Sequence, residues 1–200
     1  MGLFLTLNIK MSRPIRIKIF LIAVLCLATS VASKAQKVAI STDLVEWANF
    51  GTANLNASVS LSRHVSMNVG GRYNPWTFQT AKGSPIYNNQ TTGYVGLRYW
   101  LWYVYSGWWF GTKIQYMDFK EAGVLRPKVF DGKSLGAGLS FGYTWMLSKH
   151  FNIETSCGLW GGRHYEYSVY RTTASMELLR SGPKNFIFFD DFAVSLMYVF

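Results

Sequence analysis

The sequence has only two cysteines among its 200 residues, Cys26 and Cys157. Because Cys26 lies in a predicted leader, the mature chain has a single thiol and no intrachain disulfide. A small exported protein without disulfides needs another source of stability. Histidine is also scarce, and the spacing of His64 and His150 fits no metal motif. The sequence therefore predicts no disulfide scaffold, no metal site and no cofactor.

The chain after residue 36 lacks a heptad pattern, a convincing helix and an internal repeat. These absences argue against coiled coils, helical bundles and solenoids. What remains is a recurrent alternation of apolar and polar residues, the period expected of β-strands.

The first 35 residues are organised like a secretory signal peptide. In MSRPIRIKIFLIAVLCLATSVASKA a basic stretch is followed by an apolar run and then by small residues, with Ser33 and Ala35 before a cut at Gln36. The apolar run is shorter than the about 20 residues of a membrane-spanning helix. We predict a signal peptide over 1–35, with Met11 as an alternative start, and a mature domain over 36–200.

The leader carries half of the net charge. Residues 1–35 hold five of the twenty Lys and Arg and no acid, so the net charge falls from +10 to +5 in the mature chain. This lower charge weakens the hypothesis of nucleic-acid binding, and we expect no nucleic-acid partner.

Eight segments of the mature chain alternate with period two. They are VAISTDL, NLNASVSLS, VSMNVGGRY, YVGLRYWLW, WWFGTKIQYM, LGAGLSFGYTW, FNIETSCGL and the terminal DFAVSLMYVF. Short turns join the segments at one end. At the other end we expect long loops over 77–90, 119–133 and 163–184 and a short link over 48–53. This pattern predicts an all-β fold, an eight-stranded antiparallel up-and-down transmembrane β-barrel.

The distribution of aromatic residues decides which face of the barrel meets lipid. Aromatic residues make up 17% of the chain, and many of the large ones lie on the apolar faces, opposite Gly and Ser. Eight strands enclose little room for such bulk, whereas an outer-membrane barrel faces lipid with an apolar band and aromatic girdles. Trp76, Phe78, Trp100, Trp102, Tyr103, Trp108 and Trp109 lie near strand ends, where such girdles form. We expect an outer-membrane location; the alternative is a soluble periplasmic barrel binding an apolar ligand.

The last strand ends on an aromatic residue with alternate apolar positions, Phe192, Val194, Leu196, Tyr198 and Phe200. Pairing this strand with the first one would close the barrel and leave no open edge. The ending resembles the signal by which the assembly machinery recognises outer-membrane barrels. We expect that machinery and the membrane lipids to be partners.

The opposite, lumenal face carries three acids and three bases by the same alternation: Asp43, Arg72, Arg98, Lys113, Glu154 and Asp191. Because isolated buried charges cost several kcal/mol, balanced charges in a narrow lumen should pair. Two interpretations stay open, a salt-bridge plug that holds the barrel closed and a path for a substrate or ion.

The stretch RHYEYS supports an enzymatic alternative. Its His164, Glu166 and Ser168 are two residues apart and would share one face of a strand, where a base, its orienting partner and a nucleophile could meet. This would suit a lipid-modifying enzyme, although three polar residues also make an ordinary wet rim. The loops 119–133 and 163–184 each sum to +2, which suits either lipopolysaccharide contact or plain solvation.

The segment GGRYNPW ends in a predicted rim motif of Tyr73, Asn74, Pro75 and Trp76. Because proline cannot donate to a β-ladder, we expect the strand to end or bulge at Pro75, with Trp76 anchored at the membrane interface.

Residues 42–78, TDLVEWANFGTANLNASVSLSRHVSMNVGGRYNPWTF, resemble the start of an uncharacterised family of Gram-negative outer-membrane β-barrels of the small eight-stranded type. A T-N-L-like opening, a P-N-L-like second strand and an N-P-W rim recur in that family. Here the opening is Thr42-Asp43-Leu44 and the second strand begins Ala53-Asn54-Leu55. The resemblance is loose after residue 78. It implies an outer-membrane barrel, sometimes encoded near surface-fibre components, and it implies no catalytic residues.

The expected function is therefore non-enzymatic: a structural or surface-accessory role, anchoring or assisting a surface partner.

Overall fold

The computed structural model describes residues 38–49, 51–79, 85–122, 128–171 and 176–200, with the side chains of residues 79, 85 and 191 left out. The predicted signal peptide and its alternative start at Met11 lie outside the described residues. Among the described residues, no helix is long and apolar enough to cross a membrane.

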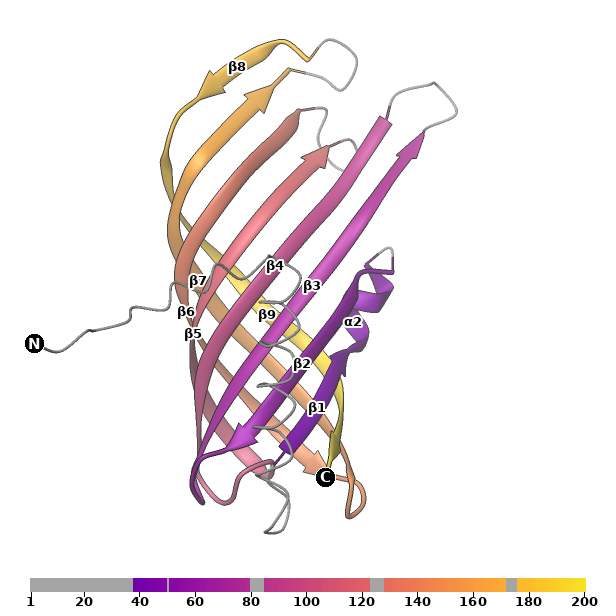
Figure 1. Cartoon of the computed structure of the whole chain (residues 1–200), viewed down its shortest axis with the longest axis vertical. Coiled ribbons are helices and arrows are strands. Elements are labelled where there is room, and N and C mark those ends of the chain that lie inside the picture. The colour runs from indigo at the N-terminus through magenta and orange to yellow at the C-terminus, as the bar shows by residue number, and fades with distance from the viewer. Residues whose placement is uncertain (1–37, 50, 80–84, 123–127, 172–175) are drawn as a thin grey trace, which may run out of the picture. The chain divides into compact units, whose positions relative to one another are not determined.

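The chain forms a closed antiparallel β-barrel (Figure 1). Its elements are β1 Val38–Asp43, α2 Leu44–Ala48, β2 Ala53–Ser60, β3 Val65–Gln79, β4 Pro85–Trp100, β5 Gly107–Ala122, β6 Val129–Met146, β7 Phe151–Tyr170, β8 Leu178–Ser181 and β9 Lys184–Val199. From β1 to β8 each strand pairs with the next, and β9 pairs with both β7 and β1, where Ile40 is opposite Tyr198. This pairing closes the cylinder.

The two labels β8 and β9 denote one strand with a break. Both segments pair with β7, and they are separated at Gly182, whose φ of +133° is a conformation that side chains rarely adopt. The barrel therefore has eight antiparallel strands, and the predicted number and all-β class are confirmed.

The strands are longer at the upper end of Figure 1 than the sequence pattern predicts. The expected loops over 77–90, 119–133 and 163–184 are wrong, because paired strands run into all three. The run Asn88–Thr92 shows why: it is polar on both faces and so lacks alternation, yet each residue pairs with β3. Backbone pairing, rather than burial of an apolar face, holds this run of β4 in the wall.

A short helix interrupts the wall, where the sequence predicted none after residue 36. Asp43 caps α2, its carboxylate accepting from the Val45 amide at 2.9 Å, and Gly51 with φ +70° follows the helix end. Because β1 stops at Asp43 and β2 begins at Ala53, the upper parts of β3 and β9 have no strand between them. We call this gap the notch.

Strand β3 does not end or bulge at Pro75, contrary to the sequence prediction. It continues to Gln79 in regular register, with Pro75 opposite Asn89 of β4. The other neighbour, β2, pairs only as far as Tyr73. Beyond that point β3 is an edge, where a residue without an N–H is tolerated.

The lower end of the lumen is filled by an aromatic plug. Trp100 and Trp109 are 0% and 1% exposed and pack with Ala39, Tyr105, Met197 and Val199. The Trp100 indole donates to the Ser66 hydroxyl at 3.0 Å. The prediction that Trp100 and Trp109 belong to an outer girdle is therefore wrong. Alternation along the strand, rather than nearness to a strand end, sets the direction of these side chains.

The outer surface is apolar between two limits. A lower ring of half-exposed aromatic residues surrounds the short turns: Tyr99, Trp102, Tyr103, Trp108, Trp145, Phe151, Tyr198 and Phe200. Above it lie exposed aliphatic and aromatic residues such as Leu139, which is 68% exposed, and then Tyr73, Tyr116 and Tyr165. The exposed ion pair of Lys133 and Glu166 lies just above this level. We call the region between these limits the apolar band.

Candidate functional site

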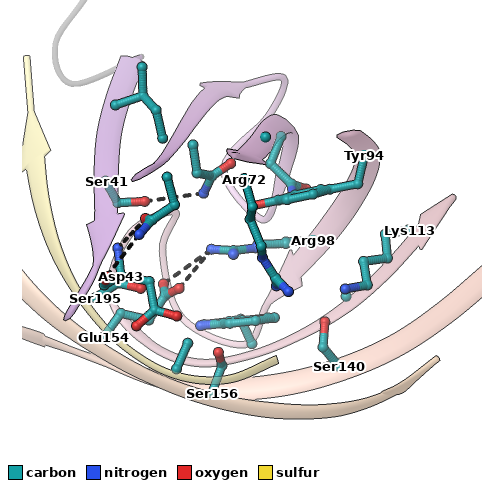
Figure 2. Close-up of a pocket in the computed structure, with 18 of the residues that line it drawn as sticks. Ser41, Asp43, Arg72, Tyr94, Arg98, Lys113, Ser140, Glu154, Ser156 and Ser195 are labelled. Atoms are coloured by element: carbon teal, nitrogen blue, oxygen red, sulfur yellow. Dashed lines mark hydrogen bonds and ion pairs between the residues drawn. The ribbon is translucent and has the colours of Figure 1, made fainter. Parts of the chain in front are cut away.

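The lumen above the aromatic plug contains a buried ion pair. Arg98 on β4 donates through one nitrogen to both Glu154 oxygens, at 3.0 and 3.2 Å (Figure 2). Thr144 donates to the same carboxylate at 2.9 Å. The guanidinium also lies over the Trp109 ring, 4.1 Å from its centroid. This pair links β4 to β7 across the lumen. Because Glu154 is only 2% exposed, the link is formed in an environment with little water.

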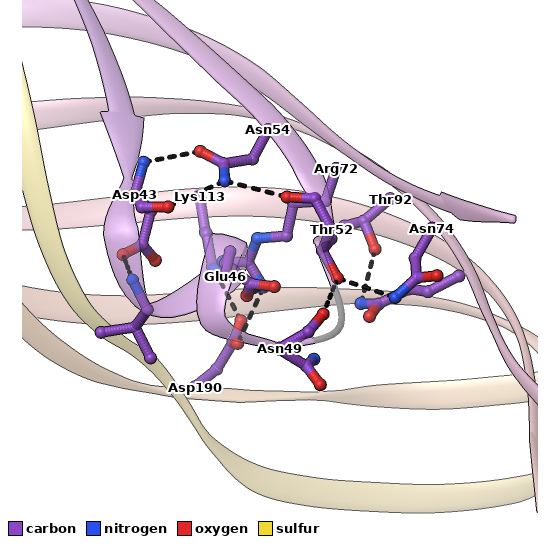
Figure 3. Close-up of polar contacts among 12 residues, drawn as sticks. Asp43, Glu46, Asn49, Thr52, Asn54, Arg72, Asn74, Thr92, Lys113 and Asp190 are labelled. Carbon is purple, nitrogen blue, oxygen red and sulfur yellow. Dashed lines mark hydrogen bonds and ion pairs between the residues drawn. The ribbon is translucent and has the colours of Figure 1, made fainter. Parts of the chain in front are cut away.

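A second layer of charges lies beside the helix α2. Asp190 accepts from Lys113 at 2.7 Å and from Arg72 at 3.4 Å, and Arg72 also pairs with Glu46 at 3.2 Å (Figure 3). Four elements, α2, β3, β5 and β9, are therefore joined by one network. Its helical member, Glu46, was not predicted, since the sequence pattern showed no helix.

The acid of this layer is Asp190, whereas alternation from the chain end pointed to Asp191. Strand β9 contains a bulge: Ser156 pairs with Ala193, but Gly158 pairs with Asp190. The extra residue reverses the alternation above it and turns Asp190 inward. The side chain of Asp191 lies outside the described residues.

Asp43 stands apart from the two ion-pair layers. Its carboxylate accepts from the amides of Val45 and Val194, at 2.9 and 3.2 Å. It therefore ties the start of α2 to β9 and lines the lumen near Arg72. Of the six predicted lumenal charges, the structure brings Arg98 together with Glu154, and Arg72 together with Lys113 through Asp190.

These layers leave little empty space. The lumen cavity between Arg72, Arg98, Lys113 and Glu154 has a volume of about 50 Å³. That is room for a few ordered waters, which need two to four polar partners each. The charged side chains around this small cavity therefore form a packed polar core. This packing favours the salt-bridge plug over an ion path.

A much larger cavity lies above the charge layers, and sequence reasoning missed it. This upper cavity has a volume of about 710 Å³ and is lined by aromatic residues of β5, β7 and β9, with Arg72 and Asp190 among its lining residues. Phe186 and Phe188 are stacked, with ring centroids 5.2 Å apart. Their alternation in KNFIFFDD is a signal that could have extended the last strand upward, had residues up to 184 not been assigned to a loop.

The proposed grouping of His164, Glu166 and Ser168 does not form. Tyr165 is the extra residue of a bulge, since Lys133 pairs with Glu166 but Ser134 pairs with His164. His164 is consequently buried and turned inward, bonded to the Ser134 hydroxyl and stacked on Phe186 at 4.2 Å. Glu166 is exposed, and its hydrogen bond raises the pKa of the Lys133 ammonium. The expectation of one shared face is wrong.

Ser168 also lacks a base among its described contacts. Its hydroxyl lies 3.4 Å from the hydroxyl of Ser181 on β8. Within the described residues, no group of three His, Cys, Asp or Glu side chains is arranged to hold a metal ion.

The rim motif is divided between the two faces. Tyr73 is 56% exposed on the outside, whereas Asn74 is buried and donates to the Thr52 hydroxyl at 2.8 Å. Trp76 shares the face of Asn74, since the register is regular, and it is half-exposed because the strand there is an edge. The outward aromatic residue of the motif is therefore Tyr73.

The terminal strand is docked in the wall. Phe192, Leu196, Tyr198 and Phe200 are exposed on the outside and Val194 is partly buried, while Met197 and Val199 belong to the aromatic plug. Recognition of this strand by assembly machinery stays a prediction.

The family described as protein of unknown function (DUF3575) matches residues 20–200, so the chain belongs to this family. No curated protein shows a significant match to the sequence.

Proposed function

We propose that this member of the DUF3575 family is an outer-membrane β-barrel with a closed lumen and a structural or surface-accessory role. It would be exported by its signal peptide and inserted by the barrel-assembly machinery of a Gram-negative cell. Its partners would be membrane lipids and a surface protein or lipopolysaccharide that it anchors or helps to assemble.

The proposal rests on the polarity of the two faces of the barrel wall, which is the reverse of that in a water-soluble barrel. Leu139, Ile114 and Leu55 are 68%, 60% and 59% exposed, whereas the lumenal Glu154, Lys113 and Gln115 are between 1% and 5% exposed. A water-soluble barrel would bury the apolar residues in its interior and expose the polar ones to water. An apolar exterior over a polar interior is the arrangement of barrels whose solvent is lipid.

The height of the apolar band supports the same proposal. On β5 the outward residues between the two aromatic limits run from Trp108 to Tyr116, close to the 9–11 residues with which a tilted strand crosses a bilayer. The strands continue well above this level, to Ala122 on β5 and Tyr170 on β7. These projecting walls offer a surface on which a partner can bind.

Both alternatives have less support. A lipid-modifying enzyme based on RHYEYS would need His164 near Ser168, and the Tyr165 bulge separates their faces. A soluble barrel would expose to water the whole lower ring of aromatic residues, which includes Trp108, Trp145 and Phe200.

Heat-modifiability tests the location. We expect the mature protein in the outer-membrane fraction after carbonate washing, and we expect unboiled and boiled samples to migrate differently on SDS gels, since a closed barrel resists SDS until heated. Recovery in the soluble periplasm, with no mobility shift, would contradict the proposal.

Bilayer conductance tests the closed lumen. We expect no steady ion conductance from the purified protein, because two ion-pair layers and the aromatic plug fill the lower lumen. An open porin reconstituted in the same bilayer serves as the positive control. Steady conductance by the wild-type protein would instead support an ion path.

A further inference from the structure

We infer that the notch is a strand-addition site, where one extended apolar segment of a partner protein pairs with the open edge of β9. This rests on the proposed surface-accessory role and deepens it, because it names the kind of partner and the place where that partner binds.

The upper part of β9 is paired on one side only. Strand β9 pairs with β1 from Ser195 to Val199, whereas its pairing with β7 continues up to Lys184. Within the part of the chain that the structure describes, no strand pairs with this upper part on its notch side. The side chains there are correspondingly uncovered, since Ile187 and Phe189 are 72% and 93% exposed. An unpaired edge of this kind is a template for another strand.

The direction of the β9 backbone groups follows from the pairing with β7. The His150 carbonyl accepts from the Val199 amide at 2.8 Å, so the even-numbered residues of β7 direct their backbone groups towards β9, as far as Trp160 in the regular register. In an antiparallel pair the two opposed residues exchange their hydrogen bonds. Because Trp160 is opposite Phe188, the N–H and C=O of Phe188 therefore face β7.

The residues on either side of Phe188 have their backbone groups in the notch. Successive residues of a strand direct N–H and C=O to opposite edges, so those of Ile187 and Phe189 face away from β7. Each residue offers one donor and one acceptor to a strand placed there. Such groups have no water to pair with in lipid, and they are open to another strand in water, so an added strand satisfies them in either solvent.

The other edge of the notch, on β3, is less suited to pairing. The Val65 carbonyl accepts from the Leu61 amide on the β2 side, so the odd-numbered residues of β3 face β2 and, above it, the notch. Pro75 is one of them and has no N–H to offer. Proline at such a position is a common protection of natural edge strands. Strand β9 contains no proline between Lys184 and Val199, so its edge is the one left open.

The surroundings of this edge favour an apolar segment. A strand paired with Ile187 and Phe189 has its side chains alternately beside those two residues and inside the barrel, next to Phe186 and Phe188. The upper cavity, with a volume of about 710 Å³, leaves room for the inward side chains. We therefore expect an occupant that is apolar on both faces over about six residues, the length of the edge from Lys184 to Phe189.

A model strand peptide tests the edge. We would titrate the protein, held in phosphatidylcholine nanodiscs, into a fluorescein-labelled peptide of alternating valine and phenylalanine flanked by lysines, and follow fluorescence anisotropy. Empty nanodiscs give the contribution of the lipid. We expect saturable binding, slower hydrogen exchange of the Ile187 and Phe189 amides, and much weaker binding of the same peptide with every backbone nitrogen methylated. No saturable binding, or equal binding of the two peptides, would overturn the inference.

Matched proline variants test which edge is used. Ile187→Pro removes one N–H from the notch and leaves the ladder to β7 intact, since Ile187 faces away from β7. It should weaken peptide binding roughly tenfold, as expected for one lost hydrogen bond. Thr77→Pro makes the same change on the notch edge of β3, so it should leave the affinity within about twofold. Equal losses in the two variants would contradict the assignment to β9.

The test separates this inference from the proposed function. If Ile187→Pro does not give the heat-modifiable form, Phe189→Pro replaces it. If the protein proves soluble, the same titration in buffer still tests the edge, so failure of pairing and failure of the membrane location are distinguished. Dimers of the protein alone that Ile187→Pro abolishes would show that a second copy occupies the edge, and they would overturn the inference of a separate partner.

Discussion

Replacing Glu154 with alanine is expected to lower the free energy of unfolding of the barrel by about 3–5 kcal/mol, the usual cost of removing one partner of a buried ion pair. Arg98 would keep its charge in a lumen where its side chain is 11% exposed, and the uncharged Trp109 ring that it lies over does not replace the lost carboxylate. Thr144 would also lose its acceptor. The decrease in the free energy of unfolding therefore comes mainly from the Arg98 charge, which stays buried without its carboxylate partner.

Glu166→Ala is the matched control for this experiment. Glu166 also pairs with a cation, Lys133 at 2.7 Å, but both side chains are exposed. Exposed pairs contribute about 0–1 kcal/mol, so this variant should unfold almost as the wild type does. Urea unfolding in the presence of detergent, followed by tryptophan fluorescence and gel mobility, measures both. Equal effects in the two variants would show that the lumen network does not stabilise the barrel.

The second large effect is expected for Gly142→Ala, one methyl group on the inner face of β6. Its Cβ would lie 2.7 Å from the Trp109 ring and closer still to the backbone carbonyl oxygen of Thr155. A ring can rotate, but a carbonyl in a β-ladder cannot move without loss of pairing. We expect the free energy of unfolding to fall by an amount at the upper end of the about 1–3 kcal/mol that is typical of overpacking. We also expect a smaller amount of the folded, heat-modifiable form of the protein.

Gly93→Ala is the control for the glycine prediction. Gly93 lies on the outer face of β4, and a Cβ there would meet no atom within 4 Å. Alanine at this position should leave stability unchanged or slightly raise it. If the two alanine variants unfold at the same urea concentration, the close packing of Trp109 against Gly142 is not a source of stability.

Period-two alternation was sufficient to predict the number of strands and their lower parts, because each strand has one apolar face there. The same alternation placed Arg98 and Glu154 in the lumen, where they pair. It was misleading at the two bulges, near Asp190 and at Tyr165, because an extra residue reverses every later side chain and only the partner strand reveals it. Alternation also could not reveal α2, a helix of five residues.

The upper cavity was beyond sequence reasoning for a related reason. Its walls are strand extensions whose polar outer residues give no burial signal, so they were assigned to loops. Its lining also combines residues distant in sequence, such as Gln115 and Phe188, which only the closed cylinder brings together. Trp160 was recognisable as aromatic, but only the packed structure shows that its indole nitrogen has no hydrogen-bond partner among the described residues.

The closure of the cylinder through β1 and β9 constrains the order of folding. The pairing joins residues 39–43 to 195–199, so no fragment that lacks the last strand can close. The Arg98–Glu154 pair joins β4 to β7 and needs only the middle of the chain, whereas Arg72–Asp190 needs the end of it. Contacts of long sequence separation carry the larger loop-closure cost. When the barrel folds, the Arg98–Glu154 pair can therefore form before the Arg72–Asp190 pair, and the helix α2 contacts β9 only when the last strand joins the wall.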